Sequence, residues 1–204
     1  MEIVCLDLEG VLVPEIWIAF AEMTGIDGLK VTTRDMPDYG KLMDQRLKYL
    51  EKHQLGLPDI QAVVDRMSPI EGARQFLDGL RERFQVVILS DTFYEFASPL
   101  IAQLGWPTLF CNRLETASDG KVVNYHIRQQ DPKRKSVQAL ASLNYRIMAV
   151  GDSYNDVSML EEAAAGFLFR PPQQVIDDYP QYPVVTEYGE LQGLILQASE
   201  TQSS

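Results

Sequence analysis

Two carboxylates, Asp7 and Glu9, follow a short apolar run at residues 3–6 and precede Gly10, where a turn is expected. The apolar run is typical of a buried strand. Acids two positions apart leave a strand on the same side, so both can point at one site. A buried strand rarely stops in two like charges unless a metal ion or a shared proton holds them. The pair alone also fits an ordinary solvated strand end, and the rest of the chain decides between these interpretations.

Two further polar clusters follow apolar runs later in the chain. The clusters are Ser90-Asp91-Thr92 after residues 86–89, and Asp152-Ser153-Tyr154-Asn155-Asp156 after residues 146–150. Up to four carboxylates (Asp7, Glu9, Asp152 and Asp156) would then share one crevice, which requires a cation. Oxygen ligands without paired His or Cys favour Mg²⁺.

Two other groups suit an anion at the same place. Ser90 offers a hydroxyl beside backbone N–H groups at a helix start, and Lys133 supplies a positive charge at the start of another helix. A cation, a hydroxyl, a lysine and a carboxylate nucleophile form a set for phosphoryl transfer. The sequence has no Gly-x-x-x-x-Gly-Lys loop, so it does not predict a P-loop nucleotide enzyme.

The elements that position these residues alternate along the chain. Strands are expected at residues 3–6, 86–89, 108–113, 121–128, 146–150, 166–169 and 183–186, with a hairpin turn near Ser118-Asp119-Gly120. Helices are expected at residues 16–24, 41–52, 59–67, 69–84, 94–104, from Asp131-Pro132, after Asp156, and at 190–198.

This alternation predicts an α/β fold, a Rossmann-like doubly wound parallel sheet with helices on both faces. Right-handed crossovers place the carboxyl end of every parallel strand on one edge, and the ligand crevice lies outside that edge. All three polar clusters fall there. Residues 1–14 and 69–204 are expected to form the core domain, and residues 15–68 a small helical cap inserted after the first strand.

The composition excludes several classes of function. A net charge of −11 over 204 residues disfavours a nucleic-acid or anionic-membrane partner, because phosphate backbones require a basic face. No apolar run approaches the roughly 20 residues of a membrane span. Cys5 and Cys111 lie in apolar strand-like runs and are expected to be buried free thiols in a reducing compartment. We therefore expect a cytoplasmic protein; the sequence does not indicate its oligomeric state.

The order of these motifs resembles the haloacid-dehalogenase superfamily over nearly the whole chain. The motifs are Asp7-x-Glu9-Gly-Val, Leu89-Ser90-Asp91-Thr92, Lys133 and Gly151-Asp152-x-x-Asn155-Asp156. The resemblance implies a haloacid-dehalogenase-like fold in which Asp7 takes phosphate as an aspartyl-phosphate, with Glu9 as acid and base. The usual second acid of the family is Asp, so Glu9 departs from the pattern, and its extra methylene moves the carboxyl by roughly 1 Å.

The resemblance also implies the ligands of the metal and of the phosphoryl group. Asp7, the backbone carbonyl of Glu9 and Asp152 would hold Mg²⁺, with Asp156 supporting the metal or its waters. The phosphoryl group and its neighbours would be bound by Ser90, Asp91, Lys133 and Asn155. For Asn155, capping of a turn is the alternative.

A helical insertion directly after the first motif resembles the phosphoserine phosphatases of this superfamily. The opening Asp-Leu-Glu-Gly-Val resembles bifunctional members that also transfer the phosphoryl group from phosphoserine to homoserine. Glu15 and Arg46 would bind the ammonium and the carboxylate of such a substrate. Alternatively, Glu15 is a helix N-terminal acid and Arg46 forms a surface ion pair with Asp44 or Glu51.

Three other functions stay open from the sequence. One is a phosphatase of another small metabolite, such as a methionine-salvage ketopentyl phosphate. Another is a dehalogenase, although that chemistry needs neither Glu9 nor a metal. The last is a non-enzymic domain that keeps the fold and binds a partner, which the complete set of reactive residues disfavours.

Overall fold

The computed structural model describes residues 1–33, 35–36 and 38–200. Residues 34, 37 and 201–204, which belong to the predicted cap and core, lie outside the described residues. The strands are β1 (Glu2–Leu6), β2 (Gln85–Phe93), β3 (Thr108–Thr116), β4 (Val122–His126), β5 (Arg146–Gly151), β6 (Ala165–Phe169) and β7 (Val184–Val185). The α-helices are α1 (Ile16–Thr24), α2 (Tyr39–His53), α3 (Leu57–Val64), α4 (Ala73–Arg81), α5 (Tyr94–Gln103), α6 (Pro132–Ser142), α7 (Val157–Glu162), α8 (Gln173–Asp178) and α9 (Tyr188–Glu200), with 3-10 turns at Asp27–Leu29 and Tyr154–Asp156.

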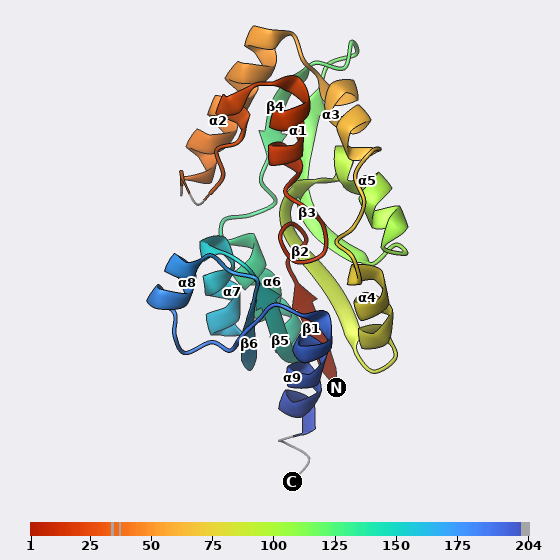
Figure 1. The fold of residues 1–204 in the computed structure, drawn as a ribbon, viewed down its shortest axis with the longest axis vertical. Helices are drawn as coiled ribbons and strands as arrows, with labels where there is room; N and C mark the ends of the chain where they lie inside the picture. The colour runs from red at the N-terminus through yellow and green to blue at the C-terminus, as the bar shows by residue number, and fades with distance from the viewer. Residues whose placement is uncertain (34, 37, 201–204) are drawn as a thin grey trace.

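The described strands form one sheet in the order β4-β3-β2-β1-β5-β6-β7. Every neighbouring pair is parallel except β3 and β4, which form the predicted antiparallel hairpin. Helices α4 and α9 pack together on the sheet, and α6 and α7 form a second packed pair against it (Figure 1). The predicted α/β, doubly wound architecture is confirmed.

Alternation along β1 explains the two faces. Val4 and Leu6 belong to one buried apolar cluster, while Ile3 and Cys5 belong to the other. Successive side chains of a strand point to opposite faces, so a strand covered on both sides must be apolar at every position. This is why the run before Asp7 reads as continuously hydrophobic.

Helices α1, α2 and α3 lie together beyond the carboxyl edge of the sheet (Figure 1). Hydrogen bonds and a ring contact join these helices to the core, in addition to the chain connections. The N–H of Leu57 donates to the carbonyl of Gly120 at the hairpin turn, and the Gln61 side chain donates to the carbonyl of Glu95 in α5. The rings of Trp17 and Phe96 also pack edge to face across this boundary, with their centroids 6.2 Å apart. The hairpin and α5 therefore share the hydrophobic core of these helices.

Two expectations about elements were wrong. The helix expected at residues 69–84 begins only at Ala73, because Gly72 has a left-handed φ of 84° and the N–H of Ile70 bonds to the carbonyl of Leu12. Helix α8, Gln173–Asp178, was not predicted, since six residues after two prolines give too short a pattern to recognise. None of the helices in the described part of the chain is both long and apolar enough to cross a membrane.

Candidate active site

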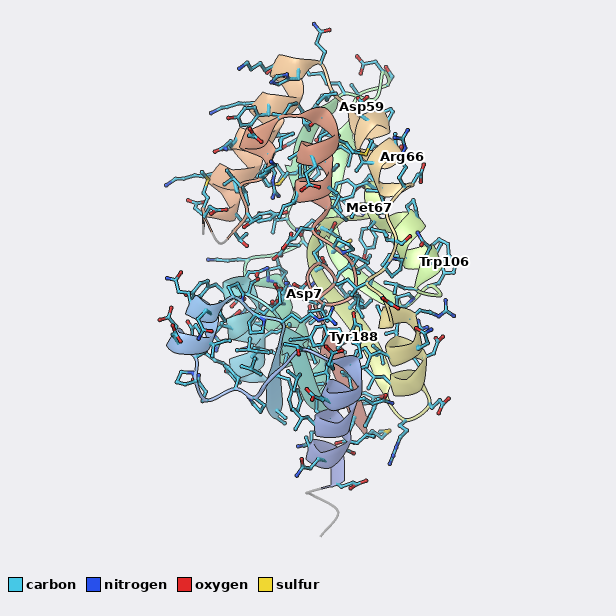
Figure 2. All side chains as sticks on the ribbon, viewed as in Figure 1. Asp7, Asp59, Arg66, Met67, Trp106 and Tyr188 are labelled. Carbon is cyan, nitrogen blue, oxygen red and sulfur yellow. The ribbon has the colours of Figure 1, made fainter. Side chains whose placement is uncertain are left out.

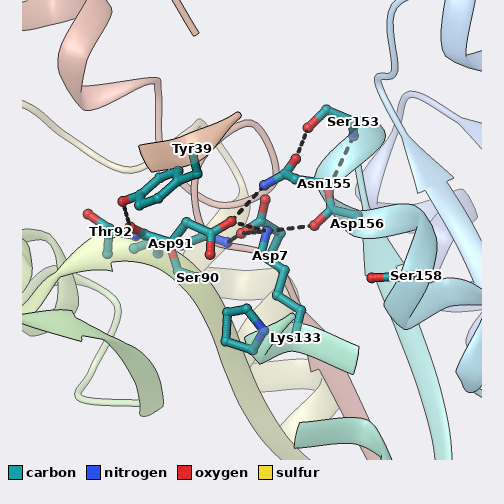
Figure 3. A network of polar contacts seen from close by, with 12 residues as sticks. Asp7, Tyr39, Ser90, Asp91, Thr92, Lys133, Ser153, Asn155, Asp156 and Ser158 are labelled. Atoms are coloured by element: carbon teal, nitrogen blue, oxygen red, sulfur yellow. Dashed lines mark hydrogen bonds and ion pairs between the residues drawn. The ribbon is translucent and has the colours of Figure 1, made fainter. Parts of the chain in front are cut away.

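Three buried aspartates gather at the carboxyl ends of β1 and β5. Asp7 follows β1 directly, and one carboxylate oxygen from each of Asp7, Asp152 and Asp156 lies within 4.8 Å of the others. The ammonium group of Lys133, from the first turn of α6, lies 2.7 Å from Oδ1 of Asp156 and 2.9 Å from Oδ1 of Asp7 (Figure 3). Figure 2 places Asp7 in the middle of the molecule, between the sheet and the α1–α3 helices. The structure thus brings together four residues that the sequence spreads over 150 positions.

The turn after β5 fixes two of these aspartates. Oδ2 of Asp156 accepts the backbone N–H groups of Asp152 at 2.9 Å and of Ser153 at 3.1 Å. Gly151 permits this close packing, since a Cβ on it would lie 2.3 Å from the Cβ of Asp156. Asp156 therefore holds the turn and Lys133 in place, and Asp152 is the member of the pair that faces the cavity.

Gly10 allows the loop after β1 to approach Asp152. Its φ is +81°, and a Cβ built on it would meet the Asp152 carboxylate at 2.6 Å. Its N–H donates to the carbonyl of Val13, which closes the loop. Only glycine fits both the backbone angle and the contact. The turn that the sequence placed at Gly10 therefore brings this loop against Asp152.

The electrostatics of the cluster favour a divalent cation. Burial, the carboxylate of Asp156 and that of Asp152 raise the pKa of Asp7 well above its ordinary value, although Lys133 opposes this. The carboxylates of Asp156, Asp7 and Asp91 raise the pKa of Lys133 well above its ordinary value, against the effect of burial. The carboxylates of Asp7, Asp152 and Asp156, when all ionised, and the ammonium of Lys133 together carry two negative charges in a buried place. A hard cation with oxygen ligands fits both the charge and the donor atoms, and Mg²⁺ is the common choice.

The end of β2 bulges toward this cluster. The pairing of β2 with β3 shifts register between Leu89 and Phe93, so residues 90–92 leave the ladder. The Ser90 hydroxyl accepts the N–H of Thr92 at 3.2 Å and keeps its own proton for a ligand. Oδ2 of Asp91 accepts from Nδ2 of Asn155 at 3.0 Å. The second and third polar clusters are thereby joined.

Glu9 lines the cavity but does not join the close group of aspartates. Its Oε2 accepts the backbone N–H of Ile16 at 2.8 Å, at the first residue of α1. Its carboxylate lies outside the group of Asp7, Asp152 and Asp156, so the side chain does not serve as a fourth carboxylate of that group. Three of the four expected carboxylates therefore form the close group, while Glu9 lines the same cavity beside it. Burial raises the pKa of Glu9, while the Ile16 N–H and the charge of Arg46 lower it.

Arg46 is inside the cavity rather than on the surface. It is 6% exposed, and its guanidinium lies 4.5 Å from the centre of the Trp17 ring. Nη2 donates to the carbonyl of Val31, whereas Nε is buried without a hydrogen-bond partner. The alternative of a surface ion pair was wrong, since Glu51 pairs instead with Lys121. Burial lowers the pKa of Arg46, and the charges of Glu9 and Glu15 oppose this shift.

One cavity contains almost all of the predicted site residues. Those lining it are Asp7, Glu9, Glu15, Arg46, Ser90, Asp91, Lys133, Asp152 and Asn155. Asp156 is fully buried behind them. Further lining residues that we did not predict as site residues are Trp17, Thr32, Thr33, Tyr39, Thr92 and Ser153. Two had a signal in the sequence: Thr92 and Ser153 stand inside the polar clusters.

The fold and this cavity define a protein of the α/β class, with its carboxylates at the carboxyl edge of a parallel sheet. The family model of the haloacid dehalogenase-like hydrolases matches residues 1–164, and the chain belongs to that family.

Several known proteins similar to this chain are named phosphoserine phosphatases. Phosphoserine phosphatase ThrH of Pseudomonas aeruginosa is 61% identical over 204 residues, and the match spans the full length of both proteins. A phosphoserine phosphatase of Pseudomonas syringae pv. tomato is 61% identical over 99% of this chain and 85% of its own length. Among solved structures, a phospho-aspartyl intermediate analogue of phosphoserine phosphatase has a TM-score of 0.75 at 22% identity, over 90% of this chain and 92% of that one. This last similarity is one of fold.

Proposed function

We propose that this protein is a Mg²⁺-dependent phosphoserine phosphatase that also transfers the phosphoryl group from phosphoserine to homoserine. The observation that carries the substrate is the position of Arg46. Its buried guanidinium keeps one N–H without a partner inside the same cavity as Asp7 and Glu15. An unpaired buried donor favours a ligand with a carboxylate, and Glu15 offers the matching charge for an ammonium. The names of the two relatives at 61% identity support the same substrate.

The reaction would begin at Asp7. A carboxylate oxygen of Asp7 attacks phosphorus, the bond from phosphorus to the serine oxygen breaks, and Glu9 gives its proton to that oxygen. Ser90 and Lys133 bind the phosphoryl oxygens and stabilise their charge. In the second half, the oxygen of water or of the homoserine hydroxyl bonds to phosphorus, the bond to Asp7 breaks, and Glu9 takes the proton.

Asp7, Asp152 and the main-chain carbonyl of Glu9 would hold Mg²⁺, with Asp156 behind them. When bound, the cation neutralises the carboxylates and the phosphoryl charge. The raised pKa of Asp7 supports this need, because a protonated carboxyl is a poor nucleophile. We assign residues 15–68 to a cap and residues 1–14 and 69–204 to the catalytic core, in the cytoplasm; the buried free thiols of Cys5 and Cys111 suit that compartment.

The direct test is incubation with phosphoserine, homoserine and MgCl₂, following inorganic phosphate and phosphohomoserine. Both products are expected. Phosphate alone would remove the transferase half, and turnover of other small esters in place of phosphoserine would favour a different metabolite phosphatase. The Asp7→Asn variant should be inactive on every ester.

Substitution of Arg46 tests the substrate assignment separately. Arg46→Ala should lower kcat/KM on phosphoserine by about 10- to 100-fold, the value of hydrogen bonds to a charged group, and change turnover of p-nitrophenyl phosphate little. Lys48→Ala, an exposed change on the same helix, is the matched control. An equal loss on both esters would contradict a role in binding the amino-acid carboxylate.

A further inference from the structure

Tyr39 joins the cap to the end of β2. It is the first residue of α2, and its hydroxyl donates to the main-chain carbonyl of Asp91 at 2.7 Å (Figure 3). Asp91 follows Ser90, the proposed phosphoryl ligand. A side chain of the cap is therefore bonded to the backbone that carries a phosphoryl-binding group, across 52 positions of sequence.

The surroundings of Tyr39 keep this bond in place. Its ring meets the ring of Tyr125 edge to face, with centroids 6.5 Å apart, and the Tyr125 hydroxyl donates to the carbonyl of Gly40 at 3.4 Å. Burial and the charge of Asp91 raise the pKa of the Tyr39 phenol, so it remains a hydrogen-bond donor at neutral pH. The start of α2 is thus held by the core and by the hairpin together.

The position of α2 matters because the helix also carries Arg46. Tyr39 and Arg46 are seven residues apart, close to two helical turns, so both lie on one face and both line the cavity. The far end of α2 is held to the hairpin by the ion pair of Glu51 and Lys121, whose side chains are 70% and 48% exposed. Exposed pairs contribute little. The Tyr39 bond is the stronger restraint and lies at the end of α2 nearest the reacting groups.

We propose that the Tyr39 hydroxyl is a latch that holds α2 closed over the cavity, and that it decides how often the aspartyl-phosphate passes to an amino-acid hydroxyl rather than to water. This inference rests on the proposed function. With α2 closed, Arg46 can hold the carboxylate of the acceptor while bulk water is kept out. With α2 open, water enters and the acceptor is held less well. The bonds made and broken are the same in both outcomes; only the attacking oxygen differs.

Tyr39→Phe removes the hydroxyl and keeps the ring against Tyr125. The Asp91 carbonyl stays satisfied, because it also accepts from Nδ2 of Asn112 at 3.1 Å. The variant is therefore expected to fold. Tyr94→Phe is the matched control: its hydroxyl donates to the carbonyl of Leu109 at 2.6 Å, within the core and outside the cavity lining.

Two measurements test the latch. The first is amide hydrogen exchange of α2 without substrate, which should be about fivefold faster in Tyr39→Phe, the value of one ordinary hydrogen bond. The second is the ratio of phosphohomoserine to inorganic phosphate at saturating homoserine, which should fall by about the same factor while the rate of serine release changes less. Tyr94→Phe should leave both measurements unchanged.

The exchange rate and the product ratio each support or overturn the proposal that Tyr39 is a latch. Unchanged exchange in Tyr39→Phe, or faster exchange with an unchanged product ratio, overturns the proposal. If the unmodified protein makes no phosphohomoserine, the transferase half of the proposed function fails and the partition fails with it. In that case the exchange measurement, which needs no substrate, still decides whether the hydroxyl restrains α2.

Discussion

Replacing Lys133 with Met tests the electrostatic design of the cluster. The change removes an ammonium that lies 2.7 Å from Asp156 and 2.9 Å from Asp7 and is 2% exposed. Removing one partner of a buried ion pair costs about 3–5 kcal/mol, because the remaining charges stay buried and uncompensated. We expect the free energy of unfolding at pH 7 in EDTA to fall by about that amount.

The same variant should bind Mg²⁺ more tightly. Without Lys133, the carboxylates of Asp7, Asp152 and Asp156 sum to three negative charges instead of a net two. Two unit charges 4 Å apart interact by about 1 kcal/mol even in bulk water, and a divalent cation doubles this repulsion from the ammonium. Its loss is expected to tighten Mg²⁺ binding at least about tenfold, although phosphatase activity falls.

Urea unfolding followed by circular dichroism, and calorimetric titration with MgCl₂, give the two quantities. Lys135→Met is the control, since Lys135 is exposed on the same helix α6. A stability loss below about 1 kcal/mol in Lys133→Met, or an unchanged affinity for Mg²⁺, would refute the reasoning that this ammonium and the cation share one buried charge cluster.

Three further predictions concern the same loops. Gly10→Ala should destabilise the protein by about 1–3 kcal/mol and weaken Mg²⁺ binding, because the Cβ of the new alanine would meet Asp152. Gly25→Ala is the control: Gly25 also has a positive φ, but a Cβ there would have nothing within 4 Å, so Mg²⁺ affinity should be unchanged in the same titration. In EDTA the urea midpoint should fall as pH rises above 3.8, the pKa of Asp7 in the unfolded chain, because the raised pKa of Asp7 makes the folded state bind more protons. Saturating Mg²⁺ should flatten this dependence on pH. A midpoint that rises over this range would contradict the raised pKa of Asp7 in the folded state. Glu9→Asp should lower kcat on phosphoserine by about 100-fold, because the shorter side chain shifts the carboxyl by roughly 1 Å from its bond to Ile16; steady-state kinetics with normal kcat would disprove it.

The sequence by itself determined the sheet and the edge on which the chemistry falls. Continuous apolar runs ending in polar residues are a local signal, and the strands before Asp7 and Asp152 were found where that signal placed them. The strand expected at residues 86–89 was found too, but it continues through Ser90, Asp91 and Thr92 to Phe93. Parallel pairing then brings their ends together without any further information. For this reason the aspartate cluster and Lys133 could be named before the structure was known.

The tertiary structure alone decided which way Glu9 and Arg46 point and how α2 meets the core. Glu9 accepts the first N–H of α1 instead of joining the aspartates, and Arg46 packs on Trp17 instead of forming an ion pair with Asp44 or Glu51. The bond of Tyr39 to Asp91 had no counterpart in the sequence pattern. These contacts join side chains of separate elements, and their geometry depends on how the helices pack on the core, which no local periodicity encodes.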